Sequence, residues 1–153
     1  MLSLAEFVPR FESEVRTFNC LLESKNVEST ESLKALSASL SRLLELGELC
    51  PESYADSDLE PPDEDETVLR DKIERNFPTF GTYFVVRPDE DRMYVADAVD
   101  DIIDIWLDLN RSIWHIREDD PANGAWYAKL MFNHWGEHAI NLKRYLHKRI
   151  YDW

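Results

Sequence analysis

The residues with the clearest chemistry form the string H-x-x-E-H at positions 134–138. Its two histidines are four residues apart, so on a helix both imidazoles lie on one face and can reach a single cation. A catalytic zinc also needs a third protein ligand and an open coordination position. Only fifteen residues follow His138, and the only acid among them is Asp152. A third ligand would therefore have to come from another helix.

H-x-x-E-H is the zinc-binding signature of the inverzincin peptidases. On a helical wheel of about 100° per residue, Glu137 lies roughly 100° from His138 and 60° from His134, so the three side chains converge only loosely. We expect His138 to lie at the edge of the core, satisfied by a carboxylate or a carbonyl, and His134 to face solvent. The alternative is a ligand or metal strip on this flank of the helix, formed by His134, His138, Asn141 and Tyr145. No catalytic residue is assigned.

An acidic row on the preceding helix is the second set of candidate ligands. Asp97, Asp101, Asp104 and Asp108 recur at three- and four-residue steps, on a stripe opposite the apolar residues of that helix. Hard oxygen ligands of this kind suit magnesium or calcium. Like charges at this spacing are also common on very acidic chains, where they form a solvated face. We therefore expect an acidic surface here.

Helices must position all of these residues, because apolar side chains recur along the chain at three- and four-residue steps. The pattern predicts five helices, near residues 3–24, 30–47, 63–77, 94–117 and 121–151. Residues 79–86 favour a short extended segment before the fourth helix, and residues 87–90 favour a turn that closes it. Trp135 should be buried against the fourth helix near Trp106. The predicted fold is all-α, a five-helix and mostly antiparallel bundle.

The length of 153 residues and the mass of 18.0 kDa favour a single helical domain over residues 1–153. Residues 51–66 contain eight acidic residues and three prolines. A segment so charged cannot bury enough surface to offset its ordering entropy, so we expect an acidic mobile loop within the domain. Cys20 and Cys50 have no metal-type spacing and lie in leucine-rich surroundings, which favours two buried free thiols.

The formal net charge of −14 and the pI near 4.6 narrow the choice of partner. Nucleic acid and anionic membrane surfaces would both repel the chain, so we expect neither as a partner, and a neutral or basic protein is favoured. No stretch approaches the 18 consecutive apolar residues of a membrane span, and the N-terminal residues do not resemble a secretion signal. The expected location is the cytoplasm. Nothing in the sequence selects an oligomeric state.

Aromatic residues are candidate anchors for a partner protein, and the chain has five tryptophans. Trp126 lies about 180° from Trp135 if both belong to one continuous helix, which would expose it. Tyr54 is one of two large apolar residues in the acidic loop. Exposed aromatic residues are favoured interface anchors. The leading hypothesis is a non-catalytic protein-binding module, and the alternative is a metal-dependent hydrolase that uses H-x-x-E-H with a divalent metal such as zinc.

Two stretches resemble a known family. The string D-I-I-D-I-W-L-D-L at 101–109 and the string F-N-H-W-G-E-H at 132–138 are similar to a bacterial domain of unknown function, number five thousand and sixty-three. The resemblance spans most of the chain and is most specific from Tyr83 onward, although the typical member has a tyrosine in place of Trp106. It implies a small helical domain without an assigned activity. It also weighs against a peptidase, because inverzincins are much larger α/β proteins.

Overall fold

The computed structural model describes residues 1–24, 28–54, 56–86 and 90–152. Six helices and one antiparallel hairpin make up the regular structure of these residues. In chain order they are α1 (Leu4–Glu23), α2 (Thr30–Glu48), α3 (Glu66–Asn76), β1 (Thr82–Val86), β2 (Met93–Asp97), α4 (Ala98–Glu118), α5 (Pro121–Leu130) and α6 (Phe132–Tyr151). The mostly helical class is confirmed. The helix count and the absence of a sheet were predicted wrongly.

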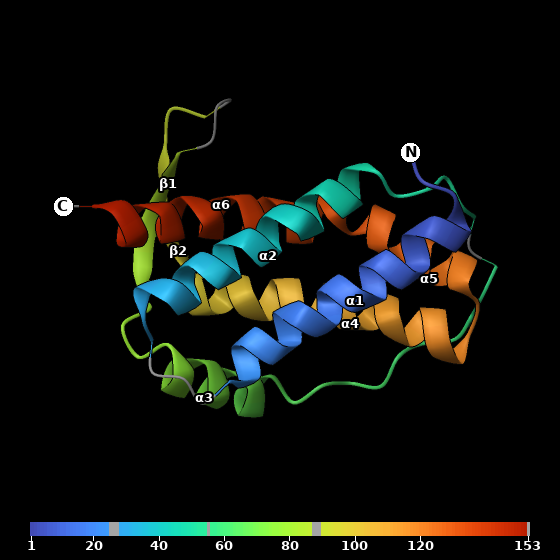
Figure 1. Ribbon diagram of the computed structural model, residues 1–153, viewed down its shortest axis with the longest axis horizontal. Helices are drawn as coiled ribbons and strands as arrows, with labels where there is room; N and C mark the ends of the chain where they lie inside the picture. The colour runs from blue at the N-terminus through green and yellow to red at the C-terminus, as the bar shows by residue number, and fades with distance from the viewer. Residues whose placement is uncertain (25–27, 55, 87–89, 153) are drawn as a thin grey trace.

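Four long helices, α1, α2, α4 and α6, surround one core (Figure 1). Helix α2 lies beside both α1 and α6, while α4 packs against α5 and α6 and also contacts α1 and α3. Each long helix presents apolar residues at three- and four-residue steps, so one stripe of each is removed from water. The largest fully buried side chains include Phe7, Phe11, Phe18, Leu36, Leu40, Leu43, Ile102, Ile105, Leu109 and Trp135. The predicted burial of Trp135 is confirmed.

The predicted fifth helix is in fact two helices, which meet at Met131. In a continuous helix the carbonyl of Ala128 would accept the backbone N–H of residue 132. Here that carbonyl instead accepts the indole Nε1–H of Trp135 at 3.0 Å. The ring of Phe132 also fills the space where a Cβ on Gly47 of α2 would lie. Tertiary contacts therefore separate α5 from α6, without a proline or glycine at the junction.

The start of the predicted fourth helix is a strand. Residues Met93–Asp97 pair antiparallel with Thr82–Val86, and Phe84 lies opposite Val95. Helix α4 begins only after Asp97, whose carboxylate accepts the N–H of Val99 at 2.8 Å. Only the first strand of this hairpin was predicted. The turn expected at 87–90 falls largely on residues 87–89, which lie outside the described part of the chain.

The acidic segment has neither helix nor strand from residue 51 to 65, apart from residue 55, which is not described. The predicted loop 51–66 and the predicted helix 63–77 overlapped, and the helix, α3, begins at Glu66. The beginning of the segment lies against α5, since the backbone N–H of Asp56 donates to the Asn123 side chain at 3.1 Å. Both cysteines are free, but Cys20 is exposed and only Cys50 is buried, so the prediction for Cys20 was wrong.

None of the helices in the described ranges has the length and apolar character that crossing a bilayer requires.

Candidate metal centre

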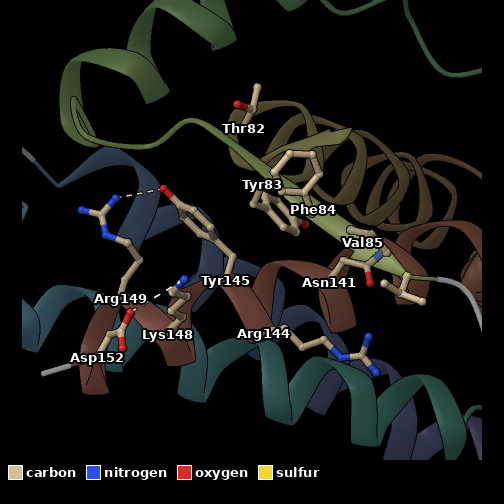
Figure 2. Close-up of a pocket in the computed structure, with 11 residues that line it drawn as sticks. Thr82, Tyr83, Phe84, Val85, Asn141, Arg144, Tyr145, Lys148, Arg149 and Asp152 are labelled. Atoms are coloured by element: carbon tan, nitrogen blue, oxygen red, sulfur yellow. Dashed lines mark hydrogen bonds and ion pairs between the residues drawn. The ribbon is translucent and has the colours of Figure 1, made fainter. Parts of the chain in front are cut away.

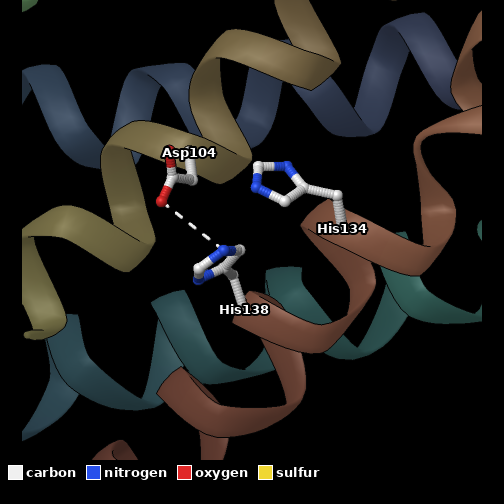
Figure 3. A group of neighbouring side chains, drawn as sticks. All are labelled: Asp104, His134 and His138. Carbon is white, nitrogen blue, oxygen red and sulfur yellow. Dashed lines mark ion pairs between the residues drawn. The ribbon is translucent and has the colours of Figure 1, made fainter. Parts of the chain in front are cut away.

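Helices α4 and α6 bring together the two motifs that the sequence presented separately. Asp104 comes from the second turn of α4, and His134 and His138 come from the first two turns of α6. Each of the three offers one ligand atom, and these atoms all lie within 4.8 Å of one another. Figure 3 shows both imidazoles reaching from α6 toward the Asp104 carboxylate on α4. This separation fits three donors arranged around one cation.

A buried carboxylate orients His134. The Nδ1 of His134 lies 2.7 Å from Oδ2 of Asp108, which is only 3% exposed. A carboxylate partner favours the tautomer with the proton on Nδ1, because Nδ1–H then donates to it. The lone pair of the neutral ring is consequently on Nε2. The His134 side chain is 46% exposed, so its ring remains accessible from solvent.

His138 has the same arrangement, and a tyrosine in turn bonds to its aspartate. Its Nδ1 lies 2.6 Å from Oδ1 of Asp101, which is also 3% exposed. The other Asp101 oxygen accepts the hydroxyl of Tyr83 from β1. His138 Nε2 lies 3.5 Å from Oδ2 of Asp104. The neutral His138 ring therefore also has its free lone pair on Nε2, facing the Asp104 carboxylate.

Burial and hydrogen bonding shift the pKa values of these groups. Burial raises the pKa of Asp104, although the nearby histidines oppose the shift, and burial likewise raises the pKa of Asp108. The hydrogen bond to Asp101 raises the pKa of His138. Burial, reinforced by the bond to Asp101, raises the pKa of Tyr83, which keeps the phenol protonated. The cluster therefore holds protons readily, and a metal ion would have to compete for them.

The acidic row of α4 is not the solvated stripe that was predicted. Asp101 and Asp108 are buried, Asp104 is partly buried, and Asp97 caps the helix. The prediction failed because α4 is covered on its polar side as well, by α6, so its carboxylates face the imidazoles across the helix interface. A buried carboxylate needs such a partner, since an unpaired charge in the interior is costly.

The other predicted site residues lie outside the ligand group. Glu137 is exposed and is not part of it. Asn141 and Tyr145 lie farther along α6 and line a pocket. Tyr54 is 83% exposed, whereas Trp126 is partly buried, because the break at Met131 removes it from the helical wheel that predicted its exposure.

Sequence reasoning missed Tyr83, and it missed the pairing of each histidine with its own aspartate. A signal was present. Asp104 and Asp108 have the same four-residue spacing as His134 and His138, which matches the contacts of His138 with Asp104 and of His134 with Asp108, but not the pairing of His138 with Asp101. Which faces meet depends on how α4 and α6 pack, and neither helix alone determines that.

The family model described as Domain of unknown function (DUF5063) matches residues 3–152. The chain belongs to the DUF5063 family. The match includes every residue of the His–Asp cluster and Tyr83. The resemblance drawn from the strings at 101–109 and 132–138 is confirmed at the level of the family, which has no assigned activity.

A crystal structure of protein BF1032 from Bacteroides fragilis has a fold similar to that of this DUF5063 chain. The TM-score is 0.76 at 18% sequence identity, and the match covers 95% of this chain and 92% of the Bacteroides protein. At this identity the similarity establishes the fold alone. No curated protein matches the chain.

Proposed function

We propose that this DUF5063 protein binds a divalent transition metal through Nε2 of His134, Nε2 of His138 and the carboxylate of Asp104. The supporting observation is that a buried carboxylate accepts a hydrogen bond from Nδ1 of each imidazole, at 2.7 Å and 2.6 Å. Metal-binding histidines typically have such a partner, because it fixes the ring and its tautomer. Two solvent-oriented surface histidines would not need buried acids behind them.

Electrostatics support a cation at this position. Asp101, Asp104 and Asp108 place three carboxylates in one cluster, and the two imidazoles must be neutral to bind a metal, so in that state they balance none of the carboxylate charge. Burial makes this surplus unfavourable, as the raised pKa values of Asp104 and Asp108 indicate. A divalent ion among the donors would change the formal charge of the three carboxylates and the metal from −3 to −1. Two imidazoles with one carboxylate suit zinc, and the same donor set occurs with iron(II).

The reaction class that fits this donor set is metal-assisted hydrolysis. Three protein ligands leave a coordination position for water, and a zinc-bound water ionises near neutral pH. The third ligand comes from α4 rather than from the H-x-x-E-H helix, and Glu137 lies outside the ligand group. The proposed centre therefore differs from that of the inverzincins even though it uses both histidines of their motif.

Zinc binding to the metal-free protein tests the proposal. We expect one zinc per chain and a higher melting temperature, since a ligand bound only by the folded state stabilises by about 2.7 kcal/mol at a hundredfold excess over Kd. His138→Gln should abolish both effects. His147→Gln is the matched control, because His147 is exposed on the same helix and outside the cluster. Unchanged zinc binding by His138→Gln would contradict the proposal.

A second proposed function is the binding of a neutral or basic protein through the acidic segment. It rests on Tyr54, which is 83% exposed among carboxylates. Capture of a partner should weaken as salt rises, because electrostatic steering is screened, and Tyr54→Ala should reduce it further. A captured partner that is insensitive to both salt and Tyr54→Ala would contradict this proposal.

A further inference from the structure

A groove of about 790 Å³ lies beside β1, between this strand and the C-terminal half of α6. All five residues of β1 line it, whereas no residue of β2 does, although the structure describes that whole strand. Figure 1 shows β1 crossing α6, and Figure 2 shows Arg144 and Tyr145 on α6 across from the strand. The groove therefore follows the free edge of β1 and does not lie beneath the hairpin.

The backbone of β1 has unused hydrogen-bonding groups at this edge. The N–H of Ala98 donates to the Gly81 carbonyl at 3.2 Å, in continuation of the strand register. Bonded and non-bonded pairs alternate along an antiparallel ladder, so the N–H and C=O groups of Phe84 and Val86 point away from β2. Within the described ranges these groups have no backbone partner beyond the hairpin. An extended chain can therefore add to β1 as a third strand.

The outer face of the hairpin is apolar and exposed. Phe84 and Val86 lie opposite Val95 and Met93, and the four side chains are between 56% and 71% exposed. Natural edge strands are commonly protected by a charge or a proline, and β1 contains neither. In an added strand, the side chains opposite Phe84 and Val86 would project to the same face. Apolar residues at alternate positions of that strand would therefore extend the apolar face.

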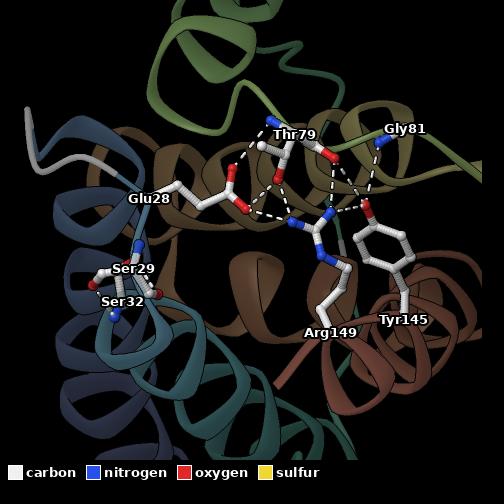
Figure 4. Close-up of polar contacts among 7 residues, drawn as sticks. All are labelled: Glu28, Ser29, Ser32, Thr79, Gly81, Tyr145 and Arg149. Atoms are coloured by element: carbon white, nitrogen blue, oxygen red, sulfur yellow. Dashed lines mark hydrogen bonds and ion pairs between the residues drawn. The ribbon is translucent and has the colours of Figure 1, made fainter. Parts of the chain in front are cut away.

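Contacts at one end of the groove join its two walls. Arg149 of α6 donates to the Thr79 carbonyl at 2.7 Å and to Oε1 of Glu28 at 2.8 Å (Figure 4). The Tyr145 hydroxyl accepts the N–H of Gly81, directly before β1, at 3.3 Å. These contacts hold strand and helix together before anything binds. A preformed groove lowers the ordering cost of binding.

The α6 wall of the groove favours an acidic occupant. Arg149 is engaged as described, and Lys148 lies 3.8 Å from Asp152. Arg144, by contrast, is exposed and has no ion-pair partner among the described residues. At physiological salt, charges more than roughly 8 Å away are largely screened, so this guanidinium outweighs the acidic surface elsewhere. A second copy of the chain fits less well, because pairing two β1 strands would bring two Arg144 side chains to one interface.

We propose that the groove binds an extended segment of a partner protein, which adds to β1 as a third strand and alternates apolar with acidic side chains. The apolar side chains lie beside Phe84 and Val86 on the outer face. The acidic side chains project toward α6, where one of them pairs with Arg144. Main-chain bonds supply affinity, and the alternating side chains supply specificity. None of the three proposed metal ligands lines the groove, so this site is independent of the metal centre.

Fluorescence anisotropy of a labelled heptapeptide of alternating valine and glutamate tests the pairing. Val86→Pro removes an N–H that points out of the hairpin, so it should leave the hairpin intact and weaken binding by about tenfold or more. Val95→Pro is the matched control. Val95 lies opposite Phe84, so its N–H also points outward, but at the other edge. This control should change the affinity by less than about twofold, because the peptide does not pair with β2.

Arg144→Gln tests the acidic side chains without altering the hairpin, since Arg144 is exposed. It should weaken binding of the valine–glutamate peptide by about three- to tenfold, as loss of a charged hydrogen bond does. A peptide of alternating valine and glutamine should change by less than about twofold, because it carries no charge for Arg144 to pair with. A valine–lysine peptide should bind the unaltered protein more weakly than the valine–glutamate peptide.

Three outcomes would overturn the proposal. They are the absence of saturable binding by the valine–glutamate peptide, equal losses in Val86→Pro and Val95→Pro, and equal affinities for the glutamate and lysine peptides. Analytical ultracentrifugation tests the competing occupant. A dimer that Val86→Pro dissociates would assign the groove to a second copy of the chain, whereas a monomer at every concentration supports the partner segment. None of these results depends on the zinc titration.

Discussion

At the scale of residues, the unusual feature is a pair of buried aspartates that each bind one histidine. Asp101 and Asp108 are both 3% exposed, and their imidazole partners are much more accessible. Buried ion pairs are weak contributors to stability, because desolvation offsets much of their attraction. Their main effect is therefore on geometry: each aspartate determines which ring nitrogen of its histidine, His134 or His138, carries the lone pair.

Asp101→Asn should lower the affinity for zinc by about 10- to 100-fold, because partners behind a metal-binding histidine have effects of this size. The amide preserves the shape of the side chain but cannot stabilise the required tautomer as a carboxylate does. Asp100→Asn is the control, since Asp100 is adjacent and exposed and pairs with Arg70. A competition titration against a zinc chelator gives both affinities, and equal affinities would show that Asp101 does not orient a ligand.

In the metal-free protein, His138 should make stability depend on pH. Its pKa is raised above the ordinary value of 6.5, first by the bond to Asp101, and the negative charges of Asp104 and Glu137 act in the same direction. The folded state therefore holds this proton more tightly, so the contribution is full below about pH 6.5 and is lost as pH rises through the folded pKa.

Urea unfolding with a chelator present measures this effect. The difference in unfolding free energy between the unaltered protein and His138→Gln should be larger at about pH 5.5 than at about pH 8.5. A difference that stays constant, or that grows with pH, would contradict this role of Asp101.

At the scale of elements, the most informative feature is the junction of α5 and α6. Periodicity and caps placed α1 to α3 and the end of α4 within a few residues, because those signals are local. The junction has no local signal, since it depends on the Trp135 indole reaching the Ala128 carbonyl and on Phe132 packing against Gly47. The second strand was missed because its residues were assigned to the start of the helix that follows, and only their pairing with β1 makes them a strand.

Gly47→Ala should destabilise the fold by about 1 to 3 kcal/mol, as overpacking of a core typically does. A Cβ at this position would overlap the Phe132 ring. Gly81→Ala is the control, because a Cβ there would meet nothing within 4 Å. Chemical denaturation of the two variants provides the comparison, and an equal effect on both would show that the contact between Gly47 and Phe132 does not hold the junction.

At the scale of the whole molecule, the site forms where two helices pack together, and the sequence of either helix alone does not predict it. The sequence identified His134, His138 and the aspartates of α4 as candidate ligands, but it presented them as two separate features. A helical wheel gives the faces of one helix and not the face of its partner, so the acidic row was assigned to solvent. The cluster appears only when α4 and α6 lie side by side.

The overall charge favours the same function. A net charge of −14 raises the local concentration of cations, and the His–Asp cluster concentrates carboxylates at one place within that field.

An anomalous difference map of zinc-soaked crystals tests the central claim most directly. We predict one strong peak about 2.0–2.2 Å from Nε2 of His134, Nε2 of His138 and one carboxylate oxygen of Asp104. The two Nδ1 atoms should keep their bonds to Asp108 and Asp101. Zinc bound elsewhere on the chain with no peak among these three residues, or a peak coordinated through Nδ1 with the aspartates displaced, would contradict the account.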